Sequence, residues 1–451
     1  MRRPNRRPNY TKTEDITNWE IPPDYLIYKD GADTVAVNGS TGEEDSRNVD
    51  SVTVIQYTLE QLTTGGKVLI KPGEYIISKS LEMYYSNQWL QGCGKLTVLK
   101  TGNSMTDYHL IKVGETGGST ITGCVISDLS VDGNKANNAT YGIGIQISSK
   151  GQFTHVRNCF IYNTRQYGVS AGGIRPHIIG NRFIGCEEAG IYFSSYDARI
   201  IGNQVRYNIQ YGVLITGNGA LVANNLINNN GLSQIRVRGI LNVIQGNQLD
   251  YCDKCGIEME GADENTITNN VGCRCEEHGV YCHNSDYNVI SNNVFQENSQ
   301  KTSNVYSGIA LVGSSNHNIV TGNEVSDLLE THMQKWGVSE GGTADYNIIS
   351  KNIAINNLTA EMNIIGANTL CDHNIGWKTE NSGTATILNA GTAIVIAHGL
   401  DGTPTVINVT GQHAEVLDIY VDTIGAANFT ITTIGGAVSA DRAIFWEAKV
   451  R

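Results

Sequence analysis

A segment that repeats itself decides the fold: IIGNRFIGCEEAGIYFSSYDAR at residues 178–199 is followed at once by IIGNQVRYNIQYGVLITGNGAL at residues 200–221. Both copies carry an apolar residue, two further residues and Asn, and later Gly followed by a β-branched residue. Between these anchors lie short stretches in which apolar and polar residues alternate. A period near 22 residues with two or three such stretches fits one coil of a parallel β-helix.

The pattern recurs from about residue 120 to residue 375, at intervals of 22 or 23 residues that lengthen to 30 and 29 at the end. Leucine-rich repeats share the period but need a leucine framework, which is missing here. We therefore predict an all-β chain built on a single-stranded parallel β-helix. The Asn anchors are Asn158, Asn181, Asn203, Asn225, Asn247, Asn270, Asn293, Asn323 and Asn352. A second series keeps step at Gly168, Gly190, Gly212, Gly256, Gly279, Gly308 and Gly337.

Equivalent residues of successive coils stack ~4.8 Å apart, so columns of side chains can be taken from the alignment. Five residues after the anchors, one column holds Asn163, Cys186, Asn208, Asn230, Cys252, Cys275 and Asn298. Stacked Asn amides are expected to form hydrogen-bonded ladders. Cys252 and Cys255, followed by Cys273 and Cys275, also have a spacing like that of zinc ligands. Stacking favours buried thiols over a zinc site or a Cys252–Cys275 disulfide.

The sequence on either side of the repeat predicts four regions. Residues 25–120 should form an N-terminal cap and the first coils, with an amphipathic helix capped by Asp50. Residues 121–376 hold the β-helix repeats, and residues 383–451 alternate as in a small C-terminal β-sandwich-like domain. Its strands are expected at Ala393–Ala397, Thr405–Val409, Asp418–Asp422, Asn428–Thr432 and Ala443–Ala448. Residues 1–24 should be a flexible basic arm, which contains Arg2, Arg3, Arg6, Arg7 and Lys12.

Composition excludes several classes of protein. Among the 451 residues are 50 Gly, 46 Asn and only 7 Pro, with 40% apolar and 17% charged side chains, so the chain can bury a core. A net charge of -12 disfavours a nucleic-acid partner. No apolar run approaches the length of a membrane span, and no hydrophobic segment follows the basic start, so we expect neither a membrane span nor a Sec-type signal peptide.

Short motifs near the start of the chain carry a family resemblance. They are Gly65-Gly66-Lys67-Val68, Lys71-Pro72-Gly73-Glu74-Tyr75, Leu90-Gln91-Gly92-Cys93-Gly94 and Val131-Asp132-Gly133-Asn134. Together with the repeats, over residues 25–376, they resemble pectate-lyase-like right-handed β-helix proteins, a group that includes viral tailspikes. The resemblance implies a right-handed coil and polysaccharide substrates. It does not choose a chemistry, because lyases, hydrolases, uronate epimerases and non-catalytic proteins share this scaffold.

The last ~70 residues also carry recognisable motifs. These are Ala397-His398-Gly399-Leu400, Gly402-Thr403-Pro404 and Phe445-Trp446-Glu447-Ala448. They resemble a C-terminal module attached to phage tail proteins. Related tailspikes form trimers, so the resemblance implies a homotrimer as an expected assembly, and an extracellular or virion-associated location.

Charged residues gather in three adjacent coils on one face of the predicted helix. After each Gly anchor, the β-branched residue should point inward and the next residue outward. The outward columns then bring together Arg236, Arg238, Glu258, Glu260, Tyr281 and His283, with Tyr192 two coils before Arg236. Arg suits a sugar carboxylate, while Glu, His and Tyr suit proton transfer. The alternative is a set of cross-coil salt bridges, Arg236 with Glu258 and Arg238 with Glu260.

Turns beside this face supply further candidates. Glu258, paired with either Glu260 or Asp253, could supply the two carboxylates of a glycoside hydrolase. His278-Gly279-Val280 resembles part of the His-Gly motif of polygalacturonases, although their paired-Asp motif and the Asp-Pro-His motif of alginate epimerases are absent. Trp336 lies beside two longer repeats. Their extra residues, at 296–306 and 327–336, are expected to form loops along the side of a groove.

These candidates favour a polysaccharide-binding and polysaccharide-degrading protein. The catalytic candidates are Glu258, Glu260, His283, Tyr281 and Asp253, and the substrate-binding candidates are Arg236, Arg238, Tyr192, His278 and Trp336. The reaction would be that of a lyase or glycoside hydrolase on an extended glycan that can contain uronic acid. The alternatives are a non-catalytic structural or receptor-binding viral tail protein, or a uronate C5-epimerase. No cofactor is expected, although Asp128 and Asp132 could bind Ca²⁺, and turn capping is the favoured role for both.

Overall fold

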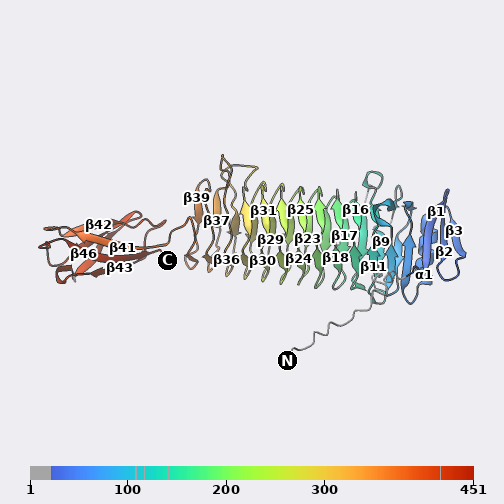
Figure 1. Ribbon diagram of the computed structural model, residues 1–451, viewed down its shortest axis with the longest axis horizontal. Coiled ribbons are helices and arrows are strands. Elements are labelled where there is room, and N and C mark those ends of the chain that lie inside the picture. Colours follow the sequence, from blue (N-terminus) through green and yellow to red (C-terminus); the bar gives the residue numbers. More distant parts are fainter. Residues whose placement is uncertain (1–21, 107–108, 116, 140–141, 417, 451) are drawn as a thin grey trace, which may run out of the picture.

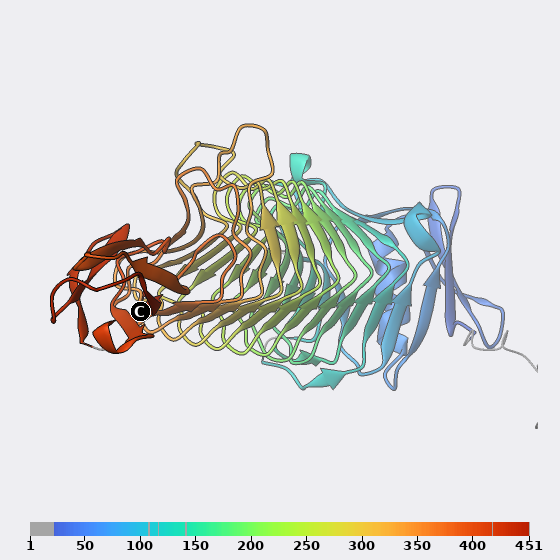
Figure 2. The same ribbon diagram turned by 60° about the vertical axis from the view of Figure 1, so that its left-hand side comes forward.

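A computed structural model describes residues 22–106, 109–115, 117–139, 142–416 and 418–450 of the chain (Figure 1). The predicted basic residues of the arm, from Arg2 to Lys12, lie outside the described residues. The described chain forms a long β-helix followed by a separate small β-domain at its C-terminal end, as both ribbon views show (Figures 1 and 2). The all-β fold class predicted from the repeat is confirmed.

Three long sheets run along the helix. Sheet A contains β1 (Tyr25–Asp30), β2 (Asp33–Asn38), β3 (Glu44–Asn48), β4 (Gly66–Ile70), β7 (Gln88–Gln91), β11 (Val125–Ser127), β15 (His155–Arg157), β18 (His177–Ile179), β21 (Arg199–Ile201), β24 (Leu221–Ala223), β27 (Val243–Gln245), β30 (Thr266–Thr268), β33 (Val289–Ser291), β36 (Ile319–Thr321), β38 (Ile348–Ser350) and β40 (Leu370–Asp372). Sheet B contains β5 (Gly73–Ile77), β8 (Thr97–Thr101), β12 (Ser130–Asp132), β16 (Phe160–Tyr162), β19 (Arg182–Ile184), β22 (Gln204–Arg206), β25 (Leu226–Asn228), β28 (Gln248–Asp250), β31 (Val271–Cys273) and β34 (Val294–Gln296).

Sheet C carries the candidate site, and its strands pair in parallel from coil to coil. It contains β6 (Leu81–Met83), β9 (His109–Val113), β13 (Ile143–Ile147), β17 (Tyr167–Ala171), β20 (Ala189–Phe193), β23 (Tyr211–Ile215), β26 (Ile235–Val237), β29 (Ile257–Glu260), β32 (Val280–His283), β35 (Ile309–Val312), β37 (Trp336–Glu340) and β39 (Ala360–Asn363). Each coil of the repeat passes through sheets A, B and C in turn. A small pair of strands, β10 (Ile121–Thr122) and β14 (Gly151–Gln152), lies outside these sheets.

Asn ladders hold the turns between sheets A and B. The side chain of Asn225 donates to the carbonyl of Ile200 at 2.9 Å and to Oδ1 of Asn247 at 2.9 Å, and the same pattern continues from coil to coil. Asn208 and Asn230 form a second ladder at the corner between sheets B and C, as the alignment predicts. A third ladder, which was not predicted, joins Asn242, Asn265, Asn288, Asn318 and Asn347 at the corner between sheets C and A.

The first position of the Asn anchor series and that of the column five residues later are each wrong by one residue, whereas the Gly series begins correctly at Gly168. Cys159 rather than Asn158 is equivalent to Asn181, because the backbone N–H of Cys159 donates to Oδ1 of Asn181 at 2.9 Å. Asn163 is likewise exposed, while the neighbouring Thr164 is buried. Asn158 and Asn163 have φ of 54° and 55°, a left-handed conformation that Asn tolerates better than most residues. Asn thus marks two different turn positions.

Helix α1 (Ser51–Gln61) covers the open N-terminal coil. Asp50 caps it by accepting a hydrogen bond from the backbone N–H of Thr53 at 3.2 Å, as its sequence predicts. Ile55 and Leu59 are buried against the first coil. The unpredicted antiparallel strands β1, β2 and β3 extend sheet A beyond β4, so pairing as well as the helix protects this end of the β-helix.

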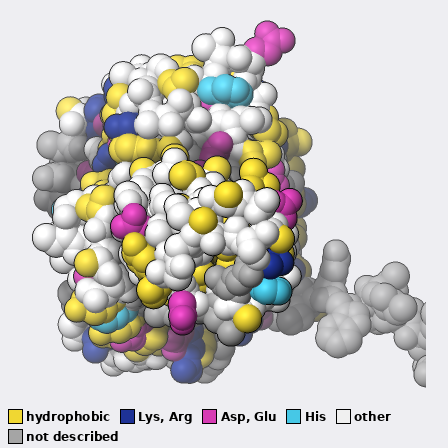
Figure 3. Space-filling model, turned by 90° about the vertical axis from the view of Figure 1, so that its left-hand side faces the viewer, with side chains coloured by type: hydrophobic (Ala, Val, Ile, Leu, Met, Phe, Trp, Pro, Cys, Tyr) yellow, Lys and Arg dark blue, Asp and Glu magenta, His cyan; other side chains and the backbone are white. Residues whose placement is uncertain are grey.

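The C-terminal domain consists of two three-stranded antiparallel sheets around a core of its own. One sheet contains β41 (Glu380–Ile387), β46 (Arg442–Lys449) and β43 (Val406–Gly411), and the other contains β42 (Ala393–Ala397), β45 (Asn428–Thr433) and β44 (Ile419–Ile424). All five predicted strands are present, but β41 was missed. Figure 3 shows that this end of the molecule carries only scattered charged side chains. No helix among the described residues has the length and apolar character that crossing a membrane requires.

Candidate functional site

The sheet C cluster lies on the outer face of three adjacent strands, β26, β29 and β32. The register pairs Arg236 with Glu258, Glu258 with Tyr281, and Glu260 with His283. The structure therefore brings these sequence-predicted residues together although they come from separate coils. We define the cluster as Ser233, Arg236, Arg238, Lys254, Glu258, Glu260, His278, Tyr281 and His283.

Glu258 is the most buried carboxylate of the cluster. The sequence analysis placed it on an exposed patch, but only 3% of the residue is exposed. Ser233 Oγ donates to its Oε2 at 2.7 Å, and the ammonium of Lys254 donates to its Oε1. Neither partner was predicted, and the only signal for Lys254 was its position four residues before Glu258. Lys254 and Ser233 thus hold Glu258 as a paired carboxylate beneath the surface.

Arg236 links the two carboxylates of the cluster. Its guanidinium contacts Glu260 and the hydroxyl of Tyr211, and lies 4.0 Å from Oε1 of Glu258. Arg238 also donates to Oε2 of Glu260, at 2.8 Å. Hydrogen bonds from Arg238 and Arg236 lower the pKa of Glu260 from 4.5 to about 2. Glu260 is therefore ionised at neutral pH and cannot donate a proton there.

The aromatic part of the cluster is a stack of three rings. His278 lies 5.1 Å from Tyr281 between ring centroids, and Tyr281 lies 6.1 Å from His283, with the latter two rings inclined by 13°. Burial raises the pKa of Tyr281, so its hydroxyl keeps its proton. Burial lowers the pKa of His278 to about 4, and its Nδ1 accepts a hydrogen bond from the backbone N–H of Ser307 at 3.0 Å. The neutral ring of His278 must then carry its proton on Nε2.

The remaining predicted residues lie outside this cluster. Tyr192 is on the same face two coils away and stacks on Tyr167, with 4.7 Å between centroids. Trp336 shares the column of His278 but lies two coils further on, with the Nζ of Lys335 3.8 Å from its ring centroid. Asp253 is exposed on the turn between β28 and β29, where it lines a groove that the cluster does not share. The pairing of Asp253 with Glu258 as hydrolytic carboxylates has no support in this arrangement.

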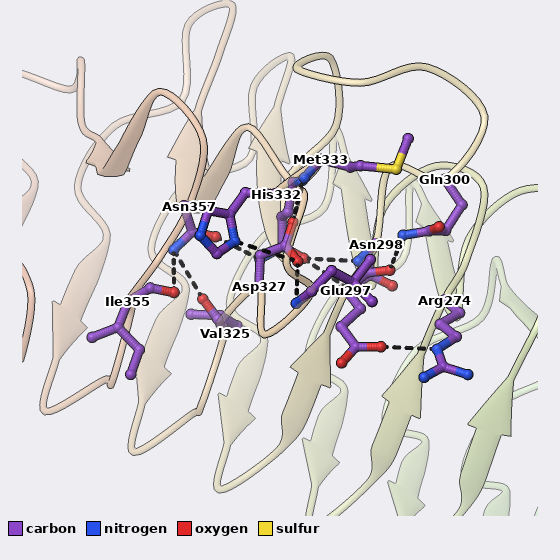
Figure 4. Close-up of polar contacts among 12 residues, drawn as sticks. Arg274, Glu297, Asn298, Gln300, Val325, Asp327, His332, Met333, Ile355 and Asn357 are labelled. Atoms are coloured by element: carbon purple, nitrogen blue, oxygen red, sulfur yellow. Dashed lines mark hydrogen bonds and ion pairs between the residues drawn. The ribbon is translucent and has the colours of Figure 1, made fainter.

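Two long loops stand at the corner between sheets B and C, beside the cluster. Asp327 organises the second loop and is fully buried. Its carboxylate accepts hydrogen bonds from the backbone N–H groups of Leu329 at 3.2 Å and Gln334 at 2.8 Å (Figure 4). The side chain of Gln334 also accepts from Asn298 at 2.9 Å and so continues an Asn ladder. Sequence reasoning missed Asp327, which fixes the shape of this loop.

The candidate Ca²⁺ ligands are engaged in turns. Asp128 accepts amide hydrogen bonds from Gln91 and Asn158, both at 3.1 Å, and Asp132 accepts from the backbone N–H of Asn134 at 2.9 Å. Such contacts are those of turn-capping carboxylates, the role favoured for both residues from the sequence. No group of three or more His, Cys, Asp or Glu in the described parts of the chain could hold a metal ion.

The four cysteines of the zinc-like motif do not meet at one point, as the ligands of a zinc ion would. Cys252 and Cys275 are both buried and stack on neighbouring coils with their sulfurs in contact. Cys273 instead lies on the outer face of sheet B, where its sulfur is 3.3 Å from Oδ1 of Asp250. Burial raises the pKa of the Cys255 thiol, which stands in the column of His278. The thiols therefore pack at separate places around the coil.

A family model described as the right handed beta helix region matches residues 89–241 and 190–335, together more than half of the chain. The chain therefore belongs to the right-handed β-helix family, as the motifs near its start suggested. No curated protein sequence gives a significant match.

Solved structures with the same fold include enzymes and viral proteins. The A-module of mannuronan C-5 epimerase AlgE6 from Azotobacter vinelandii is 18% identical, with a TM-score of 0.62 over 72% of this chain and 95% of that one. The Dettilon tailspike protein is 11% identical, with a TM-score of 0.56 over 89% and 91%. The tailspike protein gp49 of Pseudomonas phage LKA1 is 11% identical, with a TM-score of 0.51 over 87% and 91%. At these identities the likeness concerns the fold.

Proposed function

We propose that this chain binds an extended polysaccharide along the outer face of sheet C and cleaves it by elimination at the sheet C cluster. The observation that carries the proposal is one outward column in which Arg236 of β26, Glu258 of β29 and the proton-bearing Tyr281 of β32 follow one another, with His283 beside Tyr281 on β32. The likeness of the fold to the A-module of a mannuronan C-5 epimerase supports the choice of a polysaccharide as the ligand.

Each residue has a role that its surroundings support. Arg236 would pair with the carboxylate of a uronic acid and steady the enolate that forms when the neighbouring proton leaves. His283 would accept that proton on a nitrogen of its imidazole ring. Tyr281 would donate its proton to the departing glycosidic oxygen. The bond from ring carbon to this oxygen breaks as the new double bond forms, so no water is consumed.

Hydrolysis is less compatible with the same geometry. A glycoside hydrolase needs one carboxyl group that is protonated at the working pH and another that is ionised. Glu260 is ionised because its pKa is about 2, and Glu258 is held beneath the surface by Ser233 and Lys254. Both carboxylates would instead orient Arg236. An epimerase would share the first proton abstraction but return a proton to the opposite face of the sugar.

The test is incubation of the purified protein with a panel of uronans and neutral glycans. Elimination predicts ultraviolet absorbance from an unsaturated uronate at each new chain end. Tyr281→Phe and His283→Ala should both abolish it, while Tyr346→Phe, at an exposed tyrosine on the corner between sheets C and A, should keep it. New reducing ends without that absorbance would refute elimination in favour of hydrolysis. Full activity in both cluster variants would refute the site.

A non-catalytic glycan receptor is the second candidate, favoured by one observation. Every carboxylate of the cluster is paired with a cation, in the cross-coil pattern that a sheet face can use for stability alone. Binding of a glycan without any cleavage by the wild-type protein would support this function.

A further inference from the structure

A groove of about 610 Å³ runs along the corner between sheets B and C and belongs to none of the roles above. It lies on the turns that lead from sheet B to sheet C, so it is separate from the outer face of β29 and β32. Its lining consists of Tyr207, Asn208, Ile209, Asn229, Gly231, Tyr251, Cys252, Asp253, Arg274, Glu276 and Gln300.

Two exposed tyrosines stand at equivalent places of this groove. The strand register aligns Arg206, Asn228 and Asp250, so the residues that follow them, Tyr207, Asn229 and Tyr251, share one column. Tyr207 is 56% exposed and Tyr251 is 47% exposed. Since each coil rises ~4.8 Å, the two rings lie ~10 Å apart along the helix axis with the small Asn229 between them. That distance is comparable to the length of a disaccharide unit in an extended glycan.

The backbone conformation makes these tyrosines unfavourable for stability. Tyr207 and Tyr251 have φ of 55° and 50°, in the left-handed region that suits Gly and Asn. In the same column Gly185 and Asn229 show that such residues fit these turns. Replacement of these two tyrosines by Asn should therefore cost no stability, so a loss of binding in such variants would report on the rings themselves.

The tyrosine rings have cationic neighbours, and polar groups lie between them. The guanidinium of Arg206 lies 5.6 Å from the ring of Tyr207, and that of Arg274 lies 5.5 Å from the ring of Tyr251. Arg274 contacts the hydroxyl of Tyr251 and donates to Glu297 at 2.8 Å, a pair seen at the edge of Figure 4. These contacts fix the position of the Tyr251 ring before any ligand arrives.

The charges of the groove indicate what kind of sugar it fits. The lining carries one cation, Arg274, which Glu297 already neutralises, and two carboxylates, Asp253 and Glu276. Lys301 pairs with Glu276 at 3.7 Å, which leaves the groove without an excess of positive charge. A polyanion would gain little here. Flat apolar ring faces flanked by carboxylates and amides instead suit the faces and hydroxyl groups of a neutral sugar.

We propose that this groove is a second glycan-binding site, which holds a neutral segment of an extended polysaccharide on the rings of Tyr207 and Tyr251. It rests on the proposed function only in taking the same class of ligand, and it requires no chemistry at the sheet C cluster. The glycan lies along the helix axis, with one sugar ring on each tyrosine and hydroxyl groups near Asp253, Glu276 and Gln300.

The purified protein is first incubated with a printed array of neutral hexasaccharides. Titration calorimetry then measures its affinity for each hexasaccharide that it binds. The double variant Tyr207→Asn/Tyr251→Asn removes both rings while placing Asn in the conformation it prefers, so we expect it to unfold at the same or a higher temperature. Tyr346→Asn is the matched control, since Tyr346 is 53% exposed and has φ of 56°, but lies at the corner between sheets C and A.

The expected result is binding of at least one neutral hexasaccharide, weakened about tenfold or more in the double variant and unchanged in Tyr346→Asn. Absence of binding to every neutral hexasaccharide would overturn the proposal, as would equal affinity in the double variant. The variant Tyr281→Phe distinguishes binding in the groove from binding at the sheet C cluster. Loss of cleavage with retained hexasaccharide binding supports both proposals, whereas loss of hexasaccharide binding in Tyr281→Phe would place the ligand on sheet C and overturn this one.

Discussion

Removal of one amide from the middle of an Asn ladder should destabilise the protein strongly. The side chain of Asn225 donates to Ile200 and Asn247 and accepts from the backbone and side-chain nitrogens of Asn203, four hydrogen bonds between 2.9 and 3.0 Å. A buried hydrogen bond contributes ~1 kcal/mol net. Asn225→Ala should therefore lower the free energy of unfolding by about 4 kcal/mol, and somewhat more because buried polar groups of Ile200 and Asn203 lose their partners.

The neighbouring residue supplies a matched control. Asn224 is exposed and has φ of 55°, a conformation that Gly adopts freely, so Asn224→Gly should change stability by less than ~0.5 kcal/mol. Urea unfolding followed by circular dichroism would measure both variants, with the slope against denaturant checked for constancy. A loss below ~1 kcal/mol for Asn225→Ala would refute the additive account of the ladder.

Further predictions concern protons, thiols and metal. Glu260 has its pKa lowered from 4.5 to about 2, so its contribution to stability is present above pH 4.5 and lost as pH falls toward 2. Glu260→Gln should abolish that part of the acid transition, and an unchanged transition would contradict it. Burial lowers the pKa of His278 from 6.5 to about 4, so the unfolded chain binds its proton first and stability should fall from pH 6.5 to 4, but not in His278→Gln. Iodoacetamide should modify exposed Cys93 in the native protein and Cys252, whose thiol pKa burial raises, only after unfolding, as mass spectrometry would reveal. Because the oxygens of Asp128 already accept amide hydrogen bonds, EDTA should leave the thermal unfolding temperature unchanged, and a clear decrease would indicate a metal site.

The columns of the β-helix follow from the sequence because the fold stacks equivalent residues at a fixed rise. Asn181 through Asn352 repeat at the period of the coil, and each one is found in the ladder. The register failed only at the first coil, where Asn158 occupies a left-handed turn and Cys159 takes the ladder position. Asn favours both environments, so its identity alone could not place that coil.

The candidate site was predictable in outline and not in its details. The strand register predicted from the Gly anchors placed Arg236, Glu258 and Tyr281 side by side, because the outward positions are at fixed distances in sequence from each anchor. Burial of Glu258 was not predictable, because it depends on Lys254, a turn residue whose side chain reaches back over the strand. Similarly, Asp327 belongs to a loop outside the repeat, where no period constrains the position of a side chain.

The hydrogen bonding of Arg236 bears on whether the cluster exists for stability alone. A column in a parallel β-helix forces neighbouring side chains to ~4.8 Å, so opposite charges on adjacent coils are an effective way to avoid repulsion. If the charged patch served only to avoid repulsion, each of its hydrogen-bond donors should have an acceptor. Instead, Nε of Arg236 is buried without a hydrogen-bond partner among the described residues, although the rest of its guanidinium contacts Glu260 and Tyr211. An unpaired buried donor on a partly buried cation lowers stability. The unpaired Nε therefore argues that the charges of the cluster are not arranged for stability alone.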